Sequence, residues 1–172
     1  MKTPAGNGKK KYSTNFKKKI VTTDAYLSKG GQGVAVCEAC QAVYRNKRWY
    51  VGPEIVKAGT TTVKVVCPAC LKIRDNFPGG IVTLSGDYVL PHKMELLKLV
   101  KNEENRARGF NPLERVMAVK ENGHGSVIIT TTNEKLAQRL GRAIKRAFHG
   151  DVKYHWSHDN KLVRVDWVKE VA

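Results

Sequence analysis

Two matched cysteine pairs constrain this chain more than any other feature of its sequence. Cys37 and Cys40 form one Cys-x-x-Cys pair, Cys67 and Cys70 form the second after a spacer of 26 residues, and the chain has no other cysteine. A Cys-x-x-Cys turn directs two sulfurs at one point, so two such turns supply the four thiolates of a structural zinc site. We expect all four cysteines to hold one zinc ion, with no open coordination position and therefore no catalytic role for the metal.

Three other chemistries compete for cysteines in this pattern. Two disulfides would suit a secreted protein, but the first twenty residues are basic and lack the apolar stretch of a signal peptide. A redox-active Cys-x-x-Cys motif normally occurs once and not as a matched pair. Iron bound as in rubredoxin uses the same four sulfurs, so the sequence favours zinc and leaves iron open.

The charge of the chain indicates a polyanionic partner. Lysine and arginine number 31 against 15 acidic residues in 172, a net charge of +16. Such an excess attracts nucleic acid first and an anionic membrane surface second. No run of 18 apolar residues is present, so we expect no membrane-spanning segment. Reduced cysteines and the absence of a signal peptide favour the cytoplasm.

Residues 1–33 are expected to form a disordered basic tail, because they contain eight lysines and a single acid, Asp24. Tyr12 and Phe16 lie among these lysines and could stack on bases, which favours a nucleic-acid-binding arm over a merely solubilising one. The tail residues predicted to contact phosphates are Lys9, Lys10, Lys11, Lys17, Lys18 and Lys19.

Residues 34–76 are predicted to form the zinc ribbon. Arg45, Lys47 and Arg48 follow the first cysteine pair and are candidates for contacting an RNA backbone. Trp49 is expected to cover the metal site as part of a small core. Arg74 follows the second pair, and the sequence leaves open whether it approaches the thiolates or a phosphate.

Residues 77–172 are predicted to form an α+β domain. Short strands, two helices and turn residues follow one another in the order of the split βαβ, or ferredoxin-like, fold, with one extra strand. The first helix, 92–107, should bury Met94, Leu97 and Val100. The second, 134–149, carries a basic face with Arg139, Arg142 and Arg146, which we expect to bind phosphates if it is more than a solvated surface.

No catalytic set is recognisable in the sequence. The five histidines are scattered, no cysteine remains as a nucleophile, and no glycine loop is followed by the lysine and helix of a phosphate-binding motif. We therefore expect a protein that is not an enzyme.

The two cysteine pairs, the strand Ile81–Leu84, a following helix and the stretch T-T-N-E-K-L-A-Q-R-L at Thr131–Leu140 together resemble one known family. It is the zinc-ribbon family of ribosome-export and nonsense-mediated-decay adaptors, in its amino-terminal region, which binds the large ribosomal subunit. The resemblance implies that the four cysteines are metal ligands and that the partner is RNA or the ribosome. Fuller members have additional Cys-x-x-Cys pairs and further domains, so this chain looks like a short relative.

Sequence reasoning thus predicts a zinc-ribbon RNA-binding protein associated with the ribosome. One alternative is a zinc-ribbon protein that binds DNA or takes part in transcription. Another is a protein-interaction or metal-sensing module that binds no nucleic acid and uses its charge for solubility.

Overall fold

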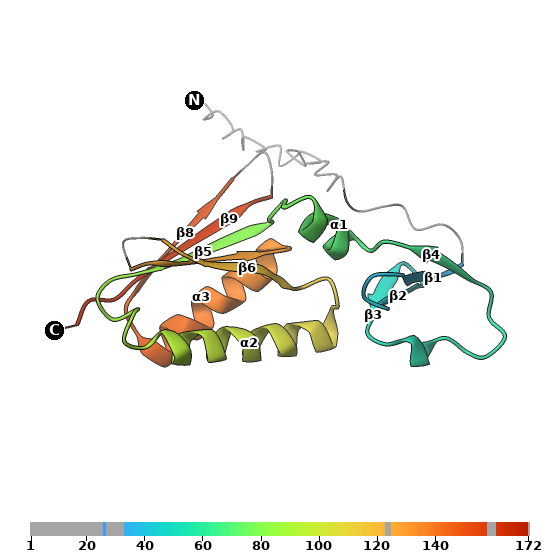
Figure 1. The fold of residues 1–172 in the computed structure, drawn as a ribbon, viewed down its shortest axis with the longest axis horizontal. Coiled ribbons are helices and arrows are strands. Elements are labelled where there is room, and N and C mark those ends of the chain that lie inside the picture. The colour runs from blue at the N-terminus through green and yellow to red at the C-terminus, as the bar shows by residue number, and fades with distance from the viewer. Residues whose placement is uncertain (1–25, 27–32, 123–124, 158–160, 172) are drawn as a thin grey trace, which may run out of the picture.

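The computed structural model describes Tyr26 and residues 33–122, 125–157 and 161–171. Two separate mixed sheets and three α-helices make up this part of the chain, so the α+β class is confirmed. Figure 1 shows the smaller sheet at one end of the molecule and the larger sheet, with two helices beneath it, at the other. Apart from Tyr26 and Gly33, the predicted basic tail lies outside the described residues.

The smaller sheet brings the two cysteine pairs to one place. Its strands lie in the order β3-β2-β1-β4, and only the β1–β4 pair is parallel. Cys37 ends β1 and pairs with Val65, the last residue of β4. Because parallel strands end at the same edge of a sheet, both Cys-x-x-Cys turns leave this edge together. The strands are β1 (Val34–Cys37), β2 (Val43–Arg45), β3 (Arg48–Tyr50) and β4 (Thr62–Val65), with a 3₁₀ turn η1 (Pro53–Ile55) before β4.

Helix α1 (Pro68–Arg74) begins inside the second cysteine pair and leads from the smaller sheet toward the larger one. Cys67 is its N-cap, and the Sγ of this residue accepts a hydrogen bond from the backbone N–H of Cys70 at 3.4 Å. Pro68 occupies the first turn, where a helix needs no backbone N–H. The helix therefore starts from a metal-ligand candidate.

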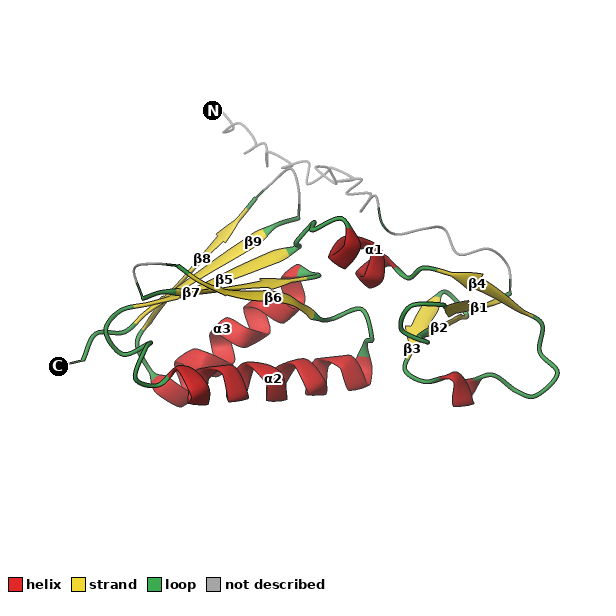
Figure 2. Cartoon of the chain, in the orientation of Figure 1, coloured by secondary structure: helices red, strands yellow, loops and turns green. Residues whose placement is uncertain are grey.

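The larger sheet has the strand order β6-β7-β5-β9-β8. Helices α2 and α3 cover one face (Figure 2), and alternate residues of the central strands, such as Val82 and Leu84, are buried toward them. This alternation is what a sheet with one covered face requires. The elements are β5 (Gly80–Ser85), α2 (Lys93–Phe110), β6 (Val116–Glu121), β7 (Val127–Thr131), α3 (Glu134–Phe148), β8 (Asp151–Trp156) and β9 (Val163–Val168).

The predicted ferredoxin-like topology is not confirmed. In the split βαβ arrangement the strand after the second helix pairs with the first strand. Here β9 lies between β5 and β8 and runs parallel to β5. The reason is hydrophobic: Val163, Val165 and Trp167 of β9 are fully buried, whereas β8 alternates half-buried residues with exposed ones and suits an edge.

Helix α3 agrees closely with its sequence prediction. The Asn133 side chain caps it by accepting a hydrogen bond from the Leu136 backbone N–H at 3.0 Å. Gly141 is buried where an added Cβ would lie 2.6 Å from the Val165 side chain, so glycine permits this close helix–sheet packing. No helix in the described part of the chain is long and apolar enough to cross a membrane.

Helix α2 differs from its prediction on one face. Val100 is buried as predicted and Leu97 is half-buried, but Met94 is 80% exposed, and Leu96 and Ala107 are buried in its place. The helix also continues past Gly109 to Phe110. The stripe that packs on the sheet therefore runs through Leu96, Val100 and Ala107 and leaves Met94 on the exposed side.

Replacing Leu140 by alanine should destabilise the larger domain by roughly 2–5 kcal/mol, because a fully buried leucine leaves a cavity. Lys145→Ala is the control on the same helix, since Lys145 is exposed and its loss should cost less than about 0.5 kcal/mol. Urea unfolding followed by circular dichroism measures both. Equal stability of the two variants would contradict the placement of Leu140 in the core.

Candidate metal centre and basic surfaces

The four cysteine sulfurs form one cluster. All lie within 4.8 Å of one another, and the Cys37–Cys70 and Cys40–Cys67 sulfurs are 3.9 and 3.6 Å apart. These separations are far longer than a disulfide bond, and all four cysteines are free. Four sulfurs arranged tetrahedrally around an ion, with bonds of about 2.3 Å, lie about 3.8 Å from one another. The cluster thus has the spacing that can hold one metal ion.

Backbone amides orient the sulfurs of this cluster. The Cys67 N–H donates to Cys37 Sγ at 3.2 Å, and the Cys70 N–H donates to Cys67 Sγ at 3.4 Å. Cys37 and Cys67 are fully buried, and Cys40 and Cys70 are half-buried. Hydrogen bonds to a thiolate favour its charged form. The local fold therefore prepares the site for anionic sulfur.

Protonation differs from one thiol of the cluster to the next. A hydrogen bond from Cys67, helped by Arg115, lowers the pKa of Cys40 to about 4, against burial, which raises it. The same hydrogen bond, together with burial, raises the pKa of Cys67, and burial raises that of Cys70. A metal must displace the protons that remain, so metal affinity should fall as the pH falls.

Arg115 completes the site, and sequence reasoning missed it. Its NH1 donates to Cys70 Sγ at 3.4 Å and its Nε donates to the Pro112 carbonyl at 2.8 Å, while the residue is only 9% exposed. Burial lowers the pKa of Arg115, but hydrogen bonding and charge interactions with Cys40 outweigh burial and raise it. A buried cation beside four sulfurs offsets part of their negative charge.

Arg115 belongs to the chain segment just before β6, in the larger domain. Its contact with Cys70 therefore connects the sulfur cluster of the smaller sheet to the larger domain. Leu113 of the same segment packs against the apolar cluster around the sulfurs. The buried Lys72 ammonium of α1 donates to the Thr132 carbonyl at 3.2 Å, and Arg48 NH2 donates to the Phe110 carbonyl at 3.4 Å. The four-cysteine cluster and its surroundings are therefore packed against the larger domain through both apolar and polar contacts.

Trp49 packs beside the four cysteines, as the sequence predicted. It is 9% exposed and belongs to the same buried cluster as Cys37 and Cys67. The Tyr44 ring lies 5.3 Å from the Trp49 ring, centroid to centroid, at an angle of 54°. These two aromatic rings close the site on the side of the β2–β3 hairpin.

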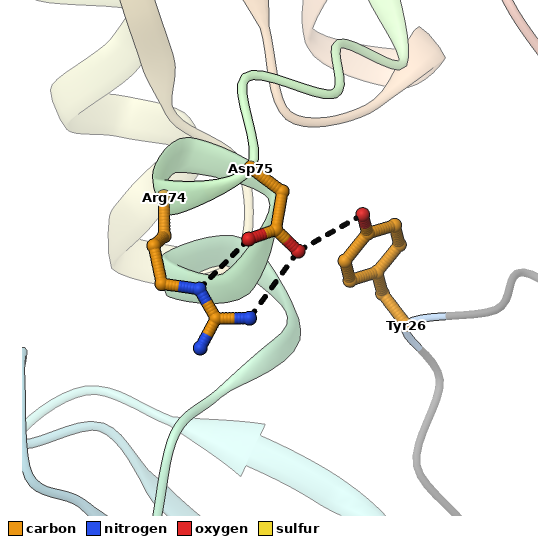
Figure 3. A network of polar contacts seen from close by, with 3 residues as sticks. All are labelled: Tyr26, Arg74 and Asp75. Atoms are coloured by element: carbon orange, nitrogen blue, oxygen red, sulfur yellow. Dashed lines mark hydrogen bonds and ion pairs between the residues drawn. The ribbon is translucent and has the colours of Figure 1, made fainter.

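Arg74, which the sequence left between two roles, pairs instead with its neighbour. Its Nε donates to Asp75 Oδ1 at 2.7 Å, and the Tyr26 hydroxyl donates to Asp75 Oδ2 at 3.1 Å (Figure 3). The Tyr26 ring also lies 5.4 Å from the Phe77 ring. The arginine that reaches a sulfur is thus Arg115, and the residues that follow α1 contact Tyr26.

The predicted phosphate-binding residues fall into three groups. Lys9, Lys10, Lys11, Lys17, Lys18 and Lys19 lie outside the described residues. Around the β2–β3 turn, Lys47 and Arg48 are exposed and Arg45 is half-buried. Asn46 and Lys47 both have positive φ, 50° and 62°, as a two-residue type I′ hairpin requires.

The third group lies on α3, where Arg142 and Arg146 are exposed and Arg139 is half-buried. The opposite side of the helix is buried against the sheet and α2. The hairpin and α3 thus present two sets of cations, carried by different halves of the molecule.

Comparison with protein-family models, with curated proteins and with solved structures produced no match to this chain. The features that bear on its function are a four-sulfur cluster that can bind a metal ion, a buried arginine that donates to one of these sulfurs, and exposed cations nearby.

Proposed function

We propose that this protein is a zinc-ribbon protein that binds RNA and associates with the ribosome. The observation that carries the proposal is the basic face of α3. Its fifteen residues include five cations and one acid, Glu134, while its other face is buried. Such a surface, on a chain of net charge +16, suits a phosphate backbone.

Zinc is the ion that best suits the sulfur cluster. Four thiolates at near-tetrahedral spacing are its usual structural ligand set, and iron held by the same sulfurs is the competitor. With all four positions taken by protein, the ion would stabilise the fold and would not activate a substrate. Its role in RNA binding is to hold the basic β2–β3 hairpin in place.

The composition of the sheet face away from the helices favours α3 as the binding surface. On the central strands β5 and β7, the half-buried side chains that alternate with the buried ones are Ile81, Thr83, Ser85, Ile128 and Thr130, and none is aromatic. Sheet surfaces that read RNA by stacking require aromatic residues at such positions. RNA binding by this domain would therefore rely on helix cations and on phosphates.

Changing Arg139, Arg142 and Arg146 together to glutamine should leave the fold unaltered and weaken binding to ribosomes. If three phosphate contacts to unpaired RNA are lost, the slope of log affinity against log salt should become shallower by about 2. Sedimentation with ribosomes across a series of salt concentrations measures this slope. The control changes Lys98, Arg106 and Arg108 of α2, three exposed cations, to glutamine.

Three outcomes would count against the proposal. Equal losses of ribosome affinity in both triple variants would mean that binding depends on the overall charge and not on the basic face of α3. Tighter binding to duplex DNA than to RNA at the same salt concentration would favour a transcription-associated protein. Binding to a protein partner that does not change with salt, without any binding to nucleic acid, would favour an interaction module.

A further inference from the structure

Two adjoining hollows lie where the β2–β3 hairpin meets the larger domain. Their volumes are ≈ 290 and ≈ 200 Å³, and both are lined by Pro68, Asn111 and Leu113. The larger hollow is also lined by Tyr44, Lys47, Arg48 and Trp49. The smaller one is also lined by Ala69, Lys72, Thr132, Asn133, Glu134, Lys135 and Lys161. Together they form one groove, which we call the junction groove.

The charge of the junction groove is strongly one-sided. Five of its lining residues are lysine or arginine, and Glu134 is the one acid among them. Lys72 is buried and donates to the Thr132 carbonyl, so it belongs to the groove wall. The other four cations are exposed: Lys47 and Arg48 are neighbours at the β2–β3 hairpin, Lys135 is on α3, and Lys161 lies just before β9. Tertiary folding alone assembles this set.

The groove also offers contacts to bases. Tyr44 is half-buried beside Trp49, so part of an aromatic surface lines the larger hollow. Asn111 is held in place, because its Oδ1 accepts from the Leu113 N–H at 3.1 Å and its Nδ2 donates to Glu114 at 3.4 Å. An asparagine amide so engaged keeps one further hydrogen to donate and one lone pair to accept with. Cations beside an aromatic wall are the recurring design of single-strand binding sites.

We propose that the junction groove binds a segment of single-stranded RNA, with phosphates on Lys47, Arg48, Lys135 and Lys161 and unpaired bases against Tyr44 and Asn111. The choice of RNA rests on the proposed function. A paired helix would offer mainly its phosphates and could not place bases in the hollows.

The test uses the full chain with its metal and a fluorescent twelve-nucleotide oligouridine. Changing Lys47, Lys135 and Lys161 to glutamine should lower affinity and make the salt slope shallower by about 2, as three lost single-strand contacts predict. The matched control changes Lys64, Lys98 and Lys153, also exposed, to glutamine and should have a much smaller effect. Metal content and circular dichroism must match the unaltered protein in both variants.

A second measurement locates the bases directly. Oligouridine containing 4-thiouridine should crosslink to peptides that carry Tyr44 or Asn111, and the Lys47/Lys135/Lys161 variant should lose these crosslinks. Equal losses of affinity in both triple variants, or crosslinks only to peptides that do not line the groove, would show that RNA binds elsewhere on the protein. RNA binding itself would then stand, but not binding in the junction groove. Equal affinity for the matching DNA oligomer would overturn the RNA assignment. Failure of the unaltered protein to bind any RNA would overturn the proposed function itself.

Discussion

Changing Cys67 to serine is expected to abolish metal binding and to unfold the smaller sheet. Cys67 is fully buried, caps α1 and lies 3.6 Å from the Cys40 sulfur. Structural zinc in small thiolate sites contributes about 10–16 kcal/mol of apparent binding energy, which is also folding energy. The buried cluster at the sulfurs consists of Cys37 and Cys67 themselves with Ala42, Trp49 and Ala69, so three small or aromatic neighbours would have to replace that contribution, and they are too few. The larger sheet has its own core and should remain folded.

Elemental analysis and two-dimensional amide NMR would measure this result. The unaltered protein, purified without chelator, should contain about one ion per chain, and the variant should contain almost none. Amide signals of residues 34–71 should collapse, while those of β5 to β9 persist. Thr62→Ser, an exposed change on β4, is the control and should keep both metal and signals. If the unaltered protein contained no metal, the proposed metal site would be wrong. If it contained iron, the site would stand but its ion would be iron and not zinc.

Changing Arg115 to alanine should weaken metal binding about 10–100-fold, the usual cost of losing a group that orients or charge-balances metal ligands. The guanidinium bridges the Cys70 sulfur and the Pro112 carbonyl, and nine-tenths of the residue is buried. Its removal takes away the cation that donates to the Cys70 sulfur and one of the contacts that hold the 111–115 segment at the cluster. The variant should therefore also loosen the contact between the two halves of the molecule.

Competition with a chromophoric zinc chelator measures the affinity, and limited proteolysis near residues 111–115 measures the loosening. Arg108→Ala removes an exposed arginine from α2 and is the matched control. Arg115→Lys keeps the charge but lacks the planar fork needed to reach both partners. Its metal affinity should therefore lie between that of Arg115→Ala and that of the unaltered protein. Unchanged affinity in Arg115→Ala would mean that the arginine only fills space.

The segment 111–115 links the sulfur cluster to the junction groove. Asn111 and Leu113 line both hollows, and Arg115 of the same segment contacts Cys70. Loss of the metal should therefore change the groove as well as the smaller sheet. If oligouridine binding proved equal with and without metal, the groove would not depend on this connection.

Short-range patterns in the sequence were sufficient for several parts of the structure. The spacing within each cysteine pair determines where two sulfurs point, so the four ligand candidates could be named without a fold. Helix α3 was equally predictable, because Asn133, the periodic buried residues and the basic opposite face all lie within one segment. Only interactions between near neighbours are needed for either prediction.

Tertiary structure decided the rest, because those features depend on residues that are distant in the chain. Arg115 is 45 positions from Cys70, and no short-range sequence pattern connects the two residues. Strand β9 occupies the interior of its sheet because Trp167 and its neighbours bury more apolar surface than β8 does. The groove cations likewise come from separate segments. The sequence by itself determined the four ligand candidates and the local elements, while the buried arginine, the strand order and the groove arose only when hydrophobic burial brought the segments together.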